Sequence, residues 1–256
     1  MAIRQISKAQ PTVDEMVALL KKTDLPTVVC EGSDDLIVYR RLEERLSHIG
    51  VSVLPAGGRK NVLQIFDRRS EIPSSVRLAF IADRDTWINT AVPDAYKTPV
   101  LCLTSGYSIE NDVIADGALE GLLVGPEVAR YKAELNDFLD WYALALDRHL
   151  ADQSNPIALH PERVLSLAER PSLMELRAGE TYPAPLRASL SSEYGMLVRG
   201  KSLLSLLVRN TNTRIGQPKH TDKALLEIVA ARPGELLTRL SDEVVAALAP
   251  LLHQPE

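Results

Sequence analysis

Short apolar runs alternate with helical segments in the first half of the chain, and this alternation constrains the fold more than any other feature. Apolar runs of strand length occupy residues 25–30, 51–55, 77–83 and 99–105. Helical spacing of apolar residues, or a glycine turn that opens a helix, follows the first two runs, and a further helix is expected after the fourth. Strands that alternate with helices pair in parallel through right-handed crossovers. We therefore predict an α/β fold with a mainly parallel sheet flanked by helices.

Strand signals fade beyond about residue 125, and amphipathic helical segments take their place. Helices are expected at residues 129–152, 162–170, 200–210, 221–231 and 235–253. This change predicts an α/β domain at residues 1–120 and a C-terminal helical domain at residues 121–256.

Composition and charge indicate a globular protein that does not coat nucleic acid by bulk attraction. The 256 residues are 45% hydrophobic and 25% charged, with a net charge of −5, and such a charge still allows a local basic groove. Residues 190–223 carry six basic and two acidic side chains, a pattern usually explained by a solvated face and alternatively by phosphate contacts. No signal-peptide pattern and no membrane-length apolar window occurs, so we expect a cytoplasmic protein without membrane contact.

The two cysteines favour neither a disulfide nor a zinc site. Cys30 and Cys102 both lie within apolar strand-like runs, where a reduced cysteine is a small buried hydrophobe. The five histidines are scattered, so zinc-ligand spacing is absent. A metal bound by this chain is therefore expected to be a hard ion with oxygen ligands.

Acidic residues follow three of the expected strands. Glu31 follows the first strand and Asp35 opens the next helix, Asp83 and Asp85 end the third strand, and Glu110 lies just past the fourth. In a strand-like extension, Asp83 and Asp85 would point to the same side. Functional groups of open parallel sheets collect at the carboxyl ends of strands, where crowded carboxylates need a cation. We predict that Mg²⁺ or Mn²⁺ is held here for phosphoryl chemistry.

The spaced motifs resemble a Toprim domain over about residues 25–116. An E-G-x-x-D element occupies residues 31–35, a D-x-D element occupies residues 83–85, and a glycine turn, Gly57-Gly58-Arg59-Lys60, lies between them. The S-x-E-N stretch at residues 108–111 is similar to OLD-family nucleases, especially the small AriB-like Toprim effectors of the PARIS anti-phage system. This resemblance implies a Toprim (Rossmann-like) catalytic domain.

The resemblance also implies roles for the acidic residues. Glu31 would be a metal ligand or a general base near the scissile phosphate. Asp83 and Asp85 would hold Mg²⁺, Glu110 would help to bind a second metal ion, and Asp35 would support this set of ligands.

A basic residue of the glycine turn would stabilise the charge that develops on the phosphate. Related sequences tend to place a lysine directly after the glycines, whereas Arg59 stands there in this chain and Lys60 follows it. Lys60 and Arg59 both remain candidates, and Lys60 is the predicted catalytic residue.

The resemblance implies a hydrolase. The enzyme would be a metal-dependent nuclease that acts in antiviral defence. Its substrate would be the phosphodiester bonds of DNA or of tRNA or another RNA. Toprim units of the OLD type commonly act with an ABC-type ATPase. This chain has no G-x-x-x-x-G-K-[ST] phosphate loop, so the ATPase would be a separate protein. An exposed apolar stripe on the C-terminal helices could also mediate a homodimer.

Two alternatives use the same residues differently. The sequence IADRDT at residues 81–86 is similar to the D-x-D-x-T motif of haloacid-dehalogenase-like phosphatases, in which Asp83 would be the nucleophile. That motif normally follows the first core strand, whereas two strands precede it here. The chain could instead be a non-catalytic Toprim partner subunit of an ATPase complex, although its full set of acidic residues favours an enzyme.

Overall fold

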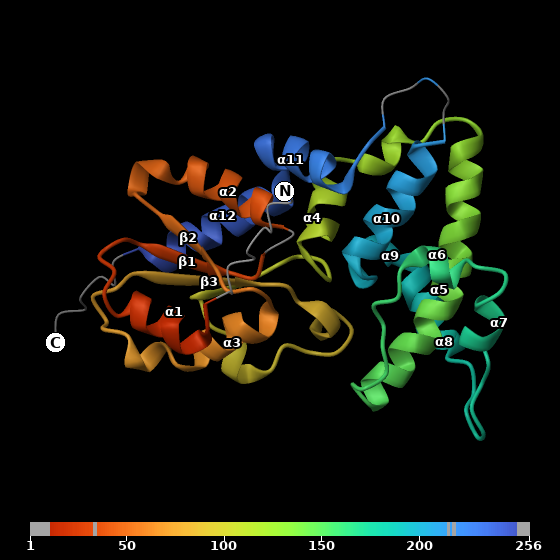
Figure 1. Cartoon of the computed structure of the whole chain (residues 1–256), viewed down its shortest axis with the longest axis horizontal. Coiled ribbons are helices and arrows are strands. Elements are labelled where there is room, and N and C mark those ends of the chain that lie inside the picture. Colours follow the sequence, from red (N-terminus) through yellow and green to blue (C-terminus); the bar gives the residue numbers. More distant parts are fainter. Residues whose placement is uncertain (1–10, 33–34, 214–215, 217–218, 250–256) are drawn as a thin grey trace, which may run out of the picture. The chain divides into compact units, whose positions relative to one another are not determined.

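The computed structural model describes residues 11–32, 35–213, 216 and 219–249 (Figure 1). Ser33 and Asp34, two residues of the E-G-x-x-D element, lie outside these residues. The chain divides into two compact units: the first contains residues 1–82, 95–103 and 240–256, and the second contains residues 83–94 and 104–239. This division does not coincide with the domain boundary expected near residue 120, because the chain enters the second unit directly after the third strand.

The first unit contains a four-stranded, all-parallel sheet, as the alternation of strands and helices predicts. Its strands are β1 (Thr27–Cys30), β2 (Ser52–Pro55), β3 (Leu78–Ala82) and β4 (Leu101–Leu103), in the order β2-β1-β3-β4. Thr27 of β1 is in register with Ser52 of β2 and with Leu78 of β3. All four residues of β1 are buried, which is typical of a parallel strand covered on both faces.

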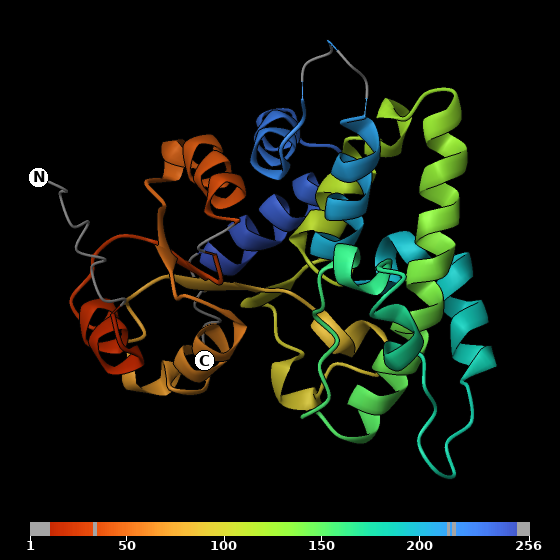
Figure 2. The ribbon, with the colours of Figure 1, turned by 45° about the vertical axis from the view of Figure 1, so that its right-hand side comes forward.

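Helices cover both faces of this sheet. Helices α1 (Val13–Leu20) and α3 (Arg59–Asp67) lie on one face and α2 (Leu36–Arg45) on the other (Figures 1 and 2). On the α1 and α3 face, Met16, Ile65 and Phe80 belong to one buried apolar cluster. The rings of Phe66 and Phe80 meet edge to face with centroids 5.4 Å apart. The sheet is thereby fixed to its helices by burial of large apolar side chains.

The second unit is helical. Its helices are α4 (Ile109–Asp116), α5 (Pro126–Ala151), α6 (Pro161–Val164), α7 (Arg170–Leu173), α8 (Ala184–Ser192), α9 (Tyr194–Leu197), α10 (Gly200–Thr211) and α11 (Asp222–Ala231), while α12 (Glu235–Leu248) continues into the first unit. Helix α10 packs against both α4 and α5. Among the described helices, none is both long enough and apolar enough to cross a membrane.

The helix expected at residues 162–170 is wrong in length. Helix α6 ends at Val164, after a single turn. Leu167, which the helical spacing would place on a buried face, is 93% exposed. Because Leu167 is exposed, burial of its side chain does not help to extend the helix.

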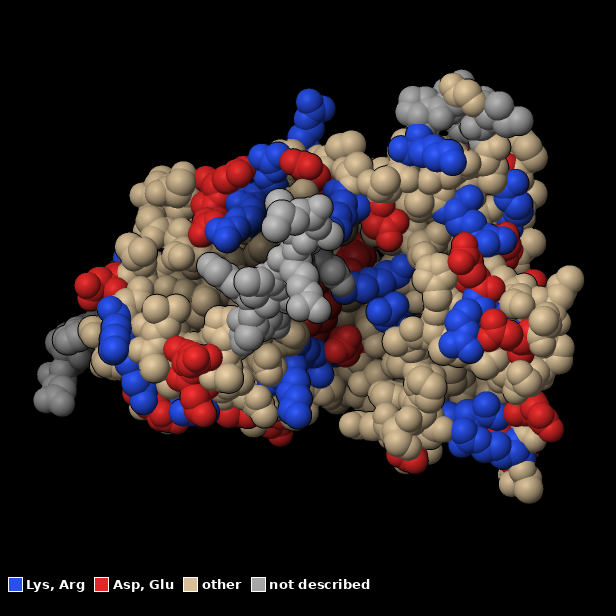
Figure 3. Space-filling view, viewed as in Figure 1, with Lys and Arg blue, Asp and Glu red and all other residues tan. Residues whose placement is uncertain are grey.

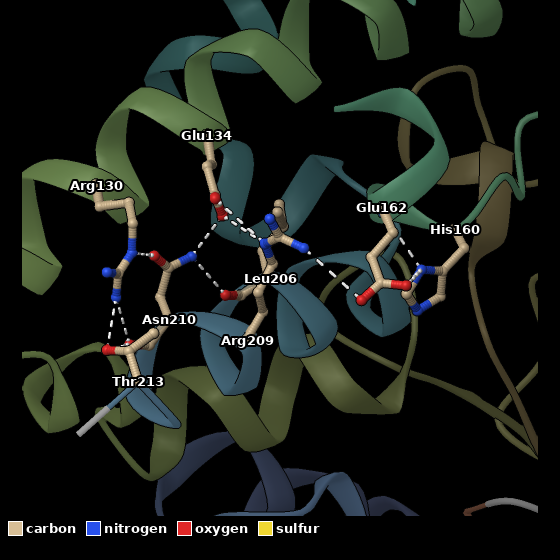
Figure 4. Close-up of polar contacts among 8 residues, drawn as sticks. All are labelled: Arg130, Glu134, His160, Glu162, Leu206, Arg209, Asn210 and Thr213. Atoms are coloured by element: carbon tan, nitrogen blue, oxygen red, sulfur yellow. Dashed lines mark hydrogen bonds and ion pairs between the residues drawn. The ribbon is translucent and has the colours of Figure 1, made fainter. Parts of the chain in front are cut away.

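A polar network connects α5 to α10 within the second unit (Figure 4). The Nδ2 of Asn210 donates to Glu134 Oε2 at 2.7 Å, and its Oδ1 accepts from Arg130 Nε at 2.7 Å. Asn210 is fully buried, whereas Arg209, which also pairs with Glu134, is half-exposed. Basic and acidic side chains alternate over α6, α7 and α10, on the right of Figure 3. Only the buried amide is expected to contribute strongly to stability.

We predict that Asn210→Ala lowers the free energy of unfolding by about 1–3 kcal/mol, because it leaves buried partners of the amide without a hydrogen bond. Arg209→Ala, the control on the same helix, should cost at most about 1 kcal/mol. Urea denaturation of both variants measures this difference. Equal losses of unfolding free energy in the two variants would contradict the stabilising role of the buried Asn210 amide.

Candidate functional site

Asp83, the first residue of the second unit, contacts the start of α4. It follows Ala82, the last residue of the strand, and the residue is only 7% exposed. Its Oδ1 accepts a hydrogen bond from the backbone N–H of Ile109, the first residue of α4, at 3.0 Å. The first N–H groups of a helix have no partner within the helix and favour negative charge. The D-x-D element is thereby held at the N-terminus of the helix that carries Glu110.

The expected strand-like extension through Asp85 is wrong. Strand β3 ends at Ala82, and Asp85 begins a 3₁₀ turn (Asp85–Ile88) with a φ of 47°. The alternation that would place Asp83 and Asp85 on one side applies only to extended backbone. Aspartate tolerates this left-handed conformation better than most residues.

Backbone hydrogen bonds hold the D-x-D segment against the segment that precedes α4. The N–H of Arg84 donates to Thr104 Oγ1 at 3.1 Å, and the N–H of Asp85 donates to the carbonyl of Tyr107 at 2.7 Å. Together with the bond between Asp83 and Ile109, these contacts bring the D-x-D and S-x-E-N elements side by side. The two motifs of the second unit are therefore neighbours in space.

Glu110 is a buried carboxylate that contacts both a hydroxyl and a lysine. Its side chain is 2% exposed, and its Oε2 accepts from Ser108 Oγ at 2.6 Å. Its Oε1 lies 3.8 Å from Nζ of Lys201, whose side chain is 38% exposed. A buried carboxylate needs hydrogen bonds or an opposite charge, and Glu110 has both. Lys201 therefore connects this buried acid to the surface.

The start of α10 approaches the S-x-E-N segment so closely that only glycine fits there. A Cβ atom on Gly200 would lie 2.5 Å from Asn111 Oδ1 and 2.6 Å from Ser108 Oγ. Asn111 is fully buried and donates from Nδ2 to the carbonyls of Gly195 and Val198, at 2.7 and 2.9 Å. Gly200 and Asn111 thus place Lys201 beside Glu110.

Asp112 is a site residue that the sequence reasoning missed. It is fully buried, and its two oxygens accept from the N–H groups of Ser105 and Gly106 at 2.9 and 2.8 Å. Burial raises the pKa of the Asp112 carboxyl, against the opposing effect of these two bonds. Asp112 shapes the loop before α4, and only its position two residues after Glu110 could have drawn attention to it.

In the first unit, Glu31 and the glycine turn share a hydrogen bond. Glu31 follows β1 and is half-buried, and its carbonyl accepts from the N–H of Gly57 at 2.9 Å. Gly58 precedes α3 with a φ of 136°, a conformation that strongly favours glycine. This bond holds the turn beside the end of β1.

The other predicted residues of the first unit differ in burial. Asp35 is buried and stands at the N-cap of α2. Of the two basic residues that begin α3, Lys60 is exposed and Arg59 is half-buried. Burial raises the pKa of the neighbouring Cys30 thiol, which keeps this cysteine neutral.

The carboxylates offer only oxygen donors, as Mg²⁺ and Mn²⁺ require. Among the described residues, no group of three or more His, Cys, Asp or Glu side chains is arranged to hold a metal ion. Mg²⁺ usually takes one or two protein carboxylates and completes its shell with water and substrate phosphates. The chemistry of Asp83 and Glu110 fits such a site.

No protein-family model matches this chain, and no curated protein sequence matches it. The resemblance to Toprim nucleases therefore remains a prediction from the motifs at residues 31–35, 83–85 and 108–111.

We predict that Gly200→Ala destabilises the protein by about 1–3 kcal/mol, because the added methyl group would overlap Asn111 and Ser108. Gly195→Ala is a matched control, since nothing lies within 4 Å of a Cβ atom built there. Thermal and urea denaturation should show a loss for the first variant and little change for the second. If both variants were as stable as the wild type, the close approach of Gly200 to Asn111 and Ser108 would not be required for stability.

Proposed function

We propose that this chain is a divalent-metal-dependent nuclease of the Toprim type that hydrolyses phosphodiester bonds in DNA or RNA. The observation that supports this most directly is the contact of the D-x-D and S-x-E-N elements through Asp83 and the first N–H of α4. The two motifs are separate in the sequence but lie side by side in the second unit. Residues that act in one catalytic site must be close together in this way.

Asp83 and Glu110 would hold Mg²⁺ or Mn²⁺ in this proposal, and Asp85 remains a further candidate ligand from the resemblance. Asp83 and Glu110 are buried, so a cation there would be poorly screened by water and strongly attracted to both carboxylates. A bound divalent ion would lower the pKa of a water molecule and neutralise charge on the phosphate oxygens.

Glu31 would act on the attacking water as a general base or as a further metal ligand. The E-G-x-x-D part of the resemblance supports including Glu31, which directly follows β1. As a base, Glu31 would take a proton from water while the water oxygen bonds to phosphorus and the phosphorus–oxygen bond of the leaving group breaks. Asp35 would support Glu31.

A lysine would stabilise the negative charge that develops on the phosphate. Lys201 is the best-supported candidate, because its ammonium group lies beside Glu110 and remains partly exposed. Lys60 remains a second candidate from the resemblance, and its exposed position on α3 leaves it accessible to a nucleic acid. Preorganised positive groups of this kind commonly supply a large part of catalysis.

The cellular setting is part of the same proposal. The resemblance to AriB-like effectors supports a cytoplasmic antiviral role together with a separate ABC-type ATPase. Such an effector could remain silent until its partner releases it, so the tests of activity should include the native cell as well as the isolated protein.

We predict that Glu31→Gln and Asp83→Asn each lower nuclease activity by roughly 10²-fold or more, because each change removes a charge needed for water activation or metal binding. Cleavage of plasmid, linear DNA and tRNA in Mg²⁺ or Mn²⁺ measures this loss. The isolated chain and cells expressing its neighbouring genes should both be assayed.

Glu44→Gln is the control for these variants. Glu44 lies on α2 with a 62% exposed side chain and forms a surface ion pair with Arg41, so loss of its charge should leave activity unchanged. Cleavage that survives Glu31→Gln would overturn the proposed site. Turnover of small phosphate esters that survives Glu31→Gln and is lost in Asp83→Asn would instead indicate Asp83 as a phosphatase nucleophile.

We predict that Lys201→Met lowers cleavage by roughly 10²-fold through loss of charge stabilisation, whereas Lys201→Arg retains part of the activity. Lys223→Met, on the exposed start of α11, is the control and should cleave as wild type does. Unfolding measurements on both variants separate the loss of activity from any loss of stability, because Lys201→Met removes the positive charge beside buried Glu110. Full activity of Lys201→Met would show that Lys201 does not take part in catalysis.

A further inference from the structure

An open cavity of about 470 Å³ lies in the second unit, between the C-terminal half of α4 and the segment that contains α9. Ile114 and Ala115 of α4 form one wall, and Tyr194, Gly195 and Met196 of α9 form another. The volume falls within the range of roughly 300–1,000 Å³ that is typical of small-molecule sites. Its surface is mostly apolar, so it would bind an apolar group.

The charged side chains that are described in the lining of the cavity are acidic. Among the described residues that line it, Glu120 and Glu193 carry carboxylates and none is a lysine or an arginine. A cavity with apolar walls and carboxylates at its edge favours a ligand with an apolar body and a positive group.

Glu120 is held in a fixed orientation by two tyrosines. The hydroxyl of Tyr194 lies 2.9 and 3.0 Å from the two carboxylate oxygens, and the hydroxyl of Tyr131 donates to Oε1 at 3.1 Å. Burial and this carboxylate raise the pKa of Tyr194 to about 12, so its hydroxyl stays a donor at neutral pH. A carboxylate oxygen accepts more than one hydrogen bond, so Glu120 can still accept from a ligand.

We propose that this cavity binds a small organic cation, an amine with an apolar body, with Glu120 as the partner of its ammonium group. The apolar body would pack against Ile114 and Met196. A preorganised carboxylate loses little freedom when it forms a charged hydrogen bond, so this contact should discriminate strongly between an amine and a neutral analogue.

Occupancy of the cavity should also affect the segment that precedes α4. The carbonyl of Met196 accepts from the N–H of Tyr107 at 2.8 Å, and the carbonyl of Gly195 accepts from Asn111 at 2.7 Å. Both acceptors belong to residues that line the cavity. A ligand that orders this wall would therefore stabilise the hydrogen bonds that hold residues 107–111.

The test uses 2-phenylethylamine as the probe, with 2-phenylethanol as its neutral analogue and 3-phenylpropanoate as an anionic one. Titration of the full chain by ligand-observed NMR should show that the amine binds about tenfold more tightly than the alcohol, and that the anion binds least. Equal binding of the three probes, or binding of none, would overturn the proposal.

Variants of residues that line the cavity test whether the amine binds there. Glu120→Gln keeps the shape of the side chain and should weaken amine binding about tenfold without changing alcohol binding. Ala115→Trp places a large side chain at an exposed position of the wall and should abolish binding of both probes. Glu162→Gln, at an exposed position of α6, is the control and should bind as wild type does. Unchanged amine affinity in Glu120→Gln would exclude Glu120 as the partner.

Amide hydrogen exchange tests the link to the neighbouring segment without any assay of nuclease activity. Exchange of the Tyr107 N–H should slow several-fold when the amine is bound and should stay at its unbound rate in Ala115→Trp with the same probe. An unchanged rate in the wild-type complex would overturn the link between the cavity and residues 107–111.

Discussion

The hydrogen bond from the first N–H of α4 to the carboxylate of Asp83 is the contact on which the arrangement of the second unit's motifs depends. It joins the residue after β3 to the helix that carries Glu110, and the bonds of Arg84 and Asp85 to the preceding loop add to it. A buried carboxylate at a helix N-terminus is stabilised by both the hydrogen bond and the helix dipole. Asp83 therefore has a structural role that does not require a bound metal ion.

The parallel sheet could be predicted because its signals are local. The runs that contain β1 to β4 are apolar and short, and helical spacing or glycine turns separate the first three. Strand ends were less predictable, since the apolar runs do not reveal where the backbone leaves the sheet. At Asp85 a positive φ turns the chain into a 3₁₀ helix, and nothing in D-R-D distinguishes this turn from an extended strand.

The neighbours of Glu110 were harder to predict, because they depend on packing between distant segments. In the sequence, Lys201 is only one of the six basic residues in the stretch 190–223. In the fold, Gly200 allows α10 to approach Ser108 and Asn111, and Lys201 thereby reaches Glu110. Such a contact follows from the shape of two helices in three dimensions, which no spacing along the chain encodes.

The charges around α4 also bear on how a phosphate would be recognised. A helix N-terminus can bind an anion directly through its free N–H groups. Here Asp83 already accepts from the N–H of Ile109, and Glu110 and Asp112 add negative charge in the first turn. These carboxylates would repel a phosphate that approached the helix alone. Attraction must therefore come from added positive charge, for which Lys201 and a divalent cation are the natural sources, and this requirement links the structural role of Asp83 to the proposed metal dependence.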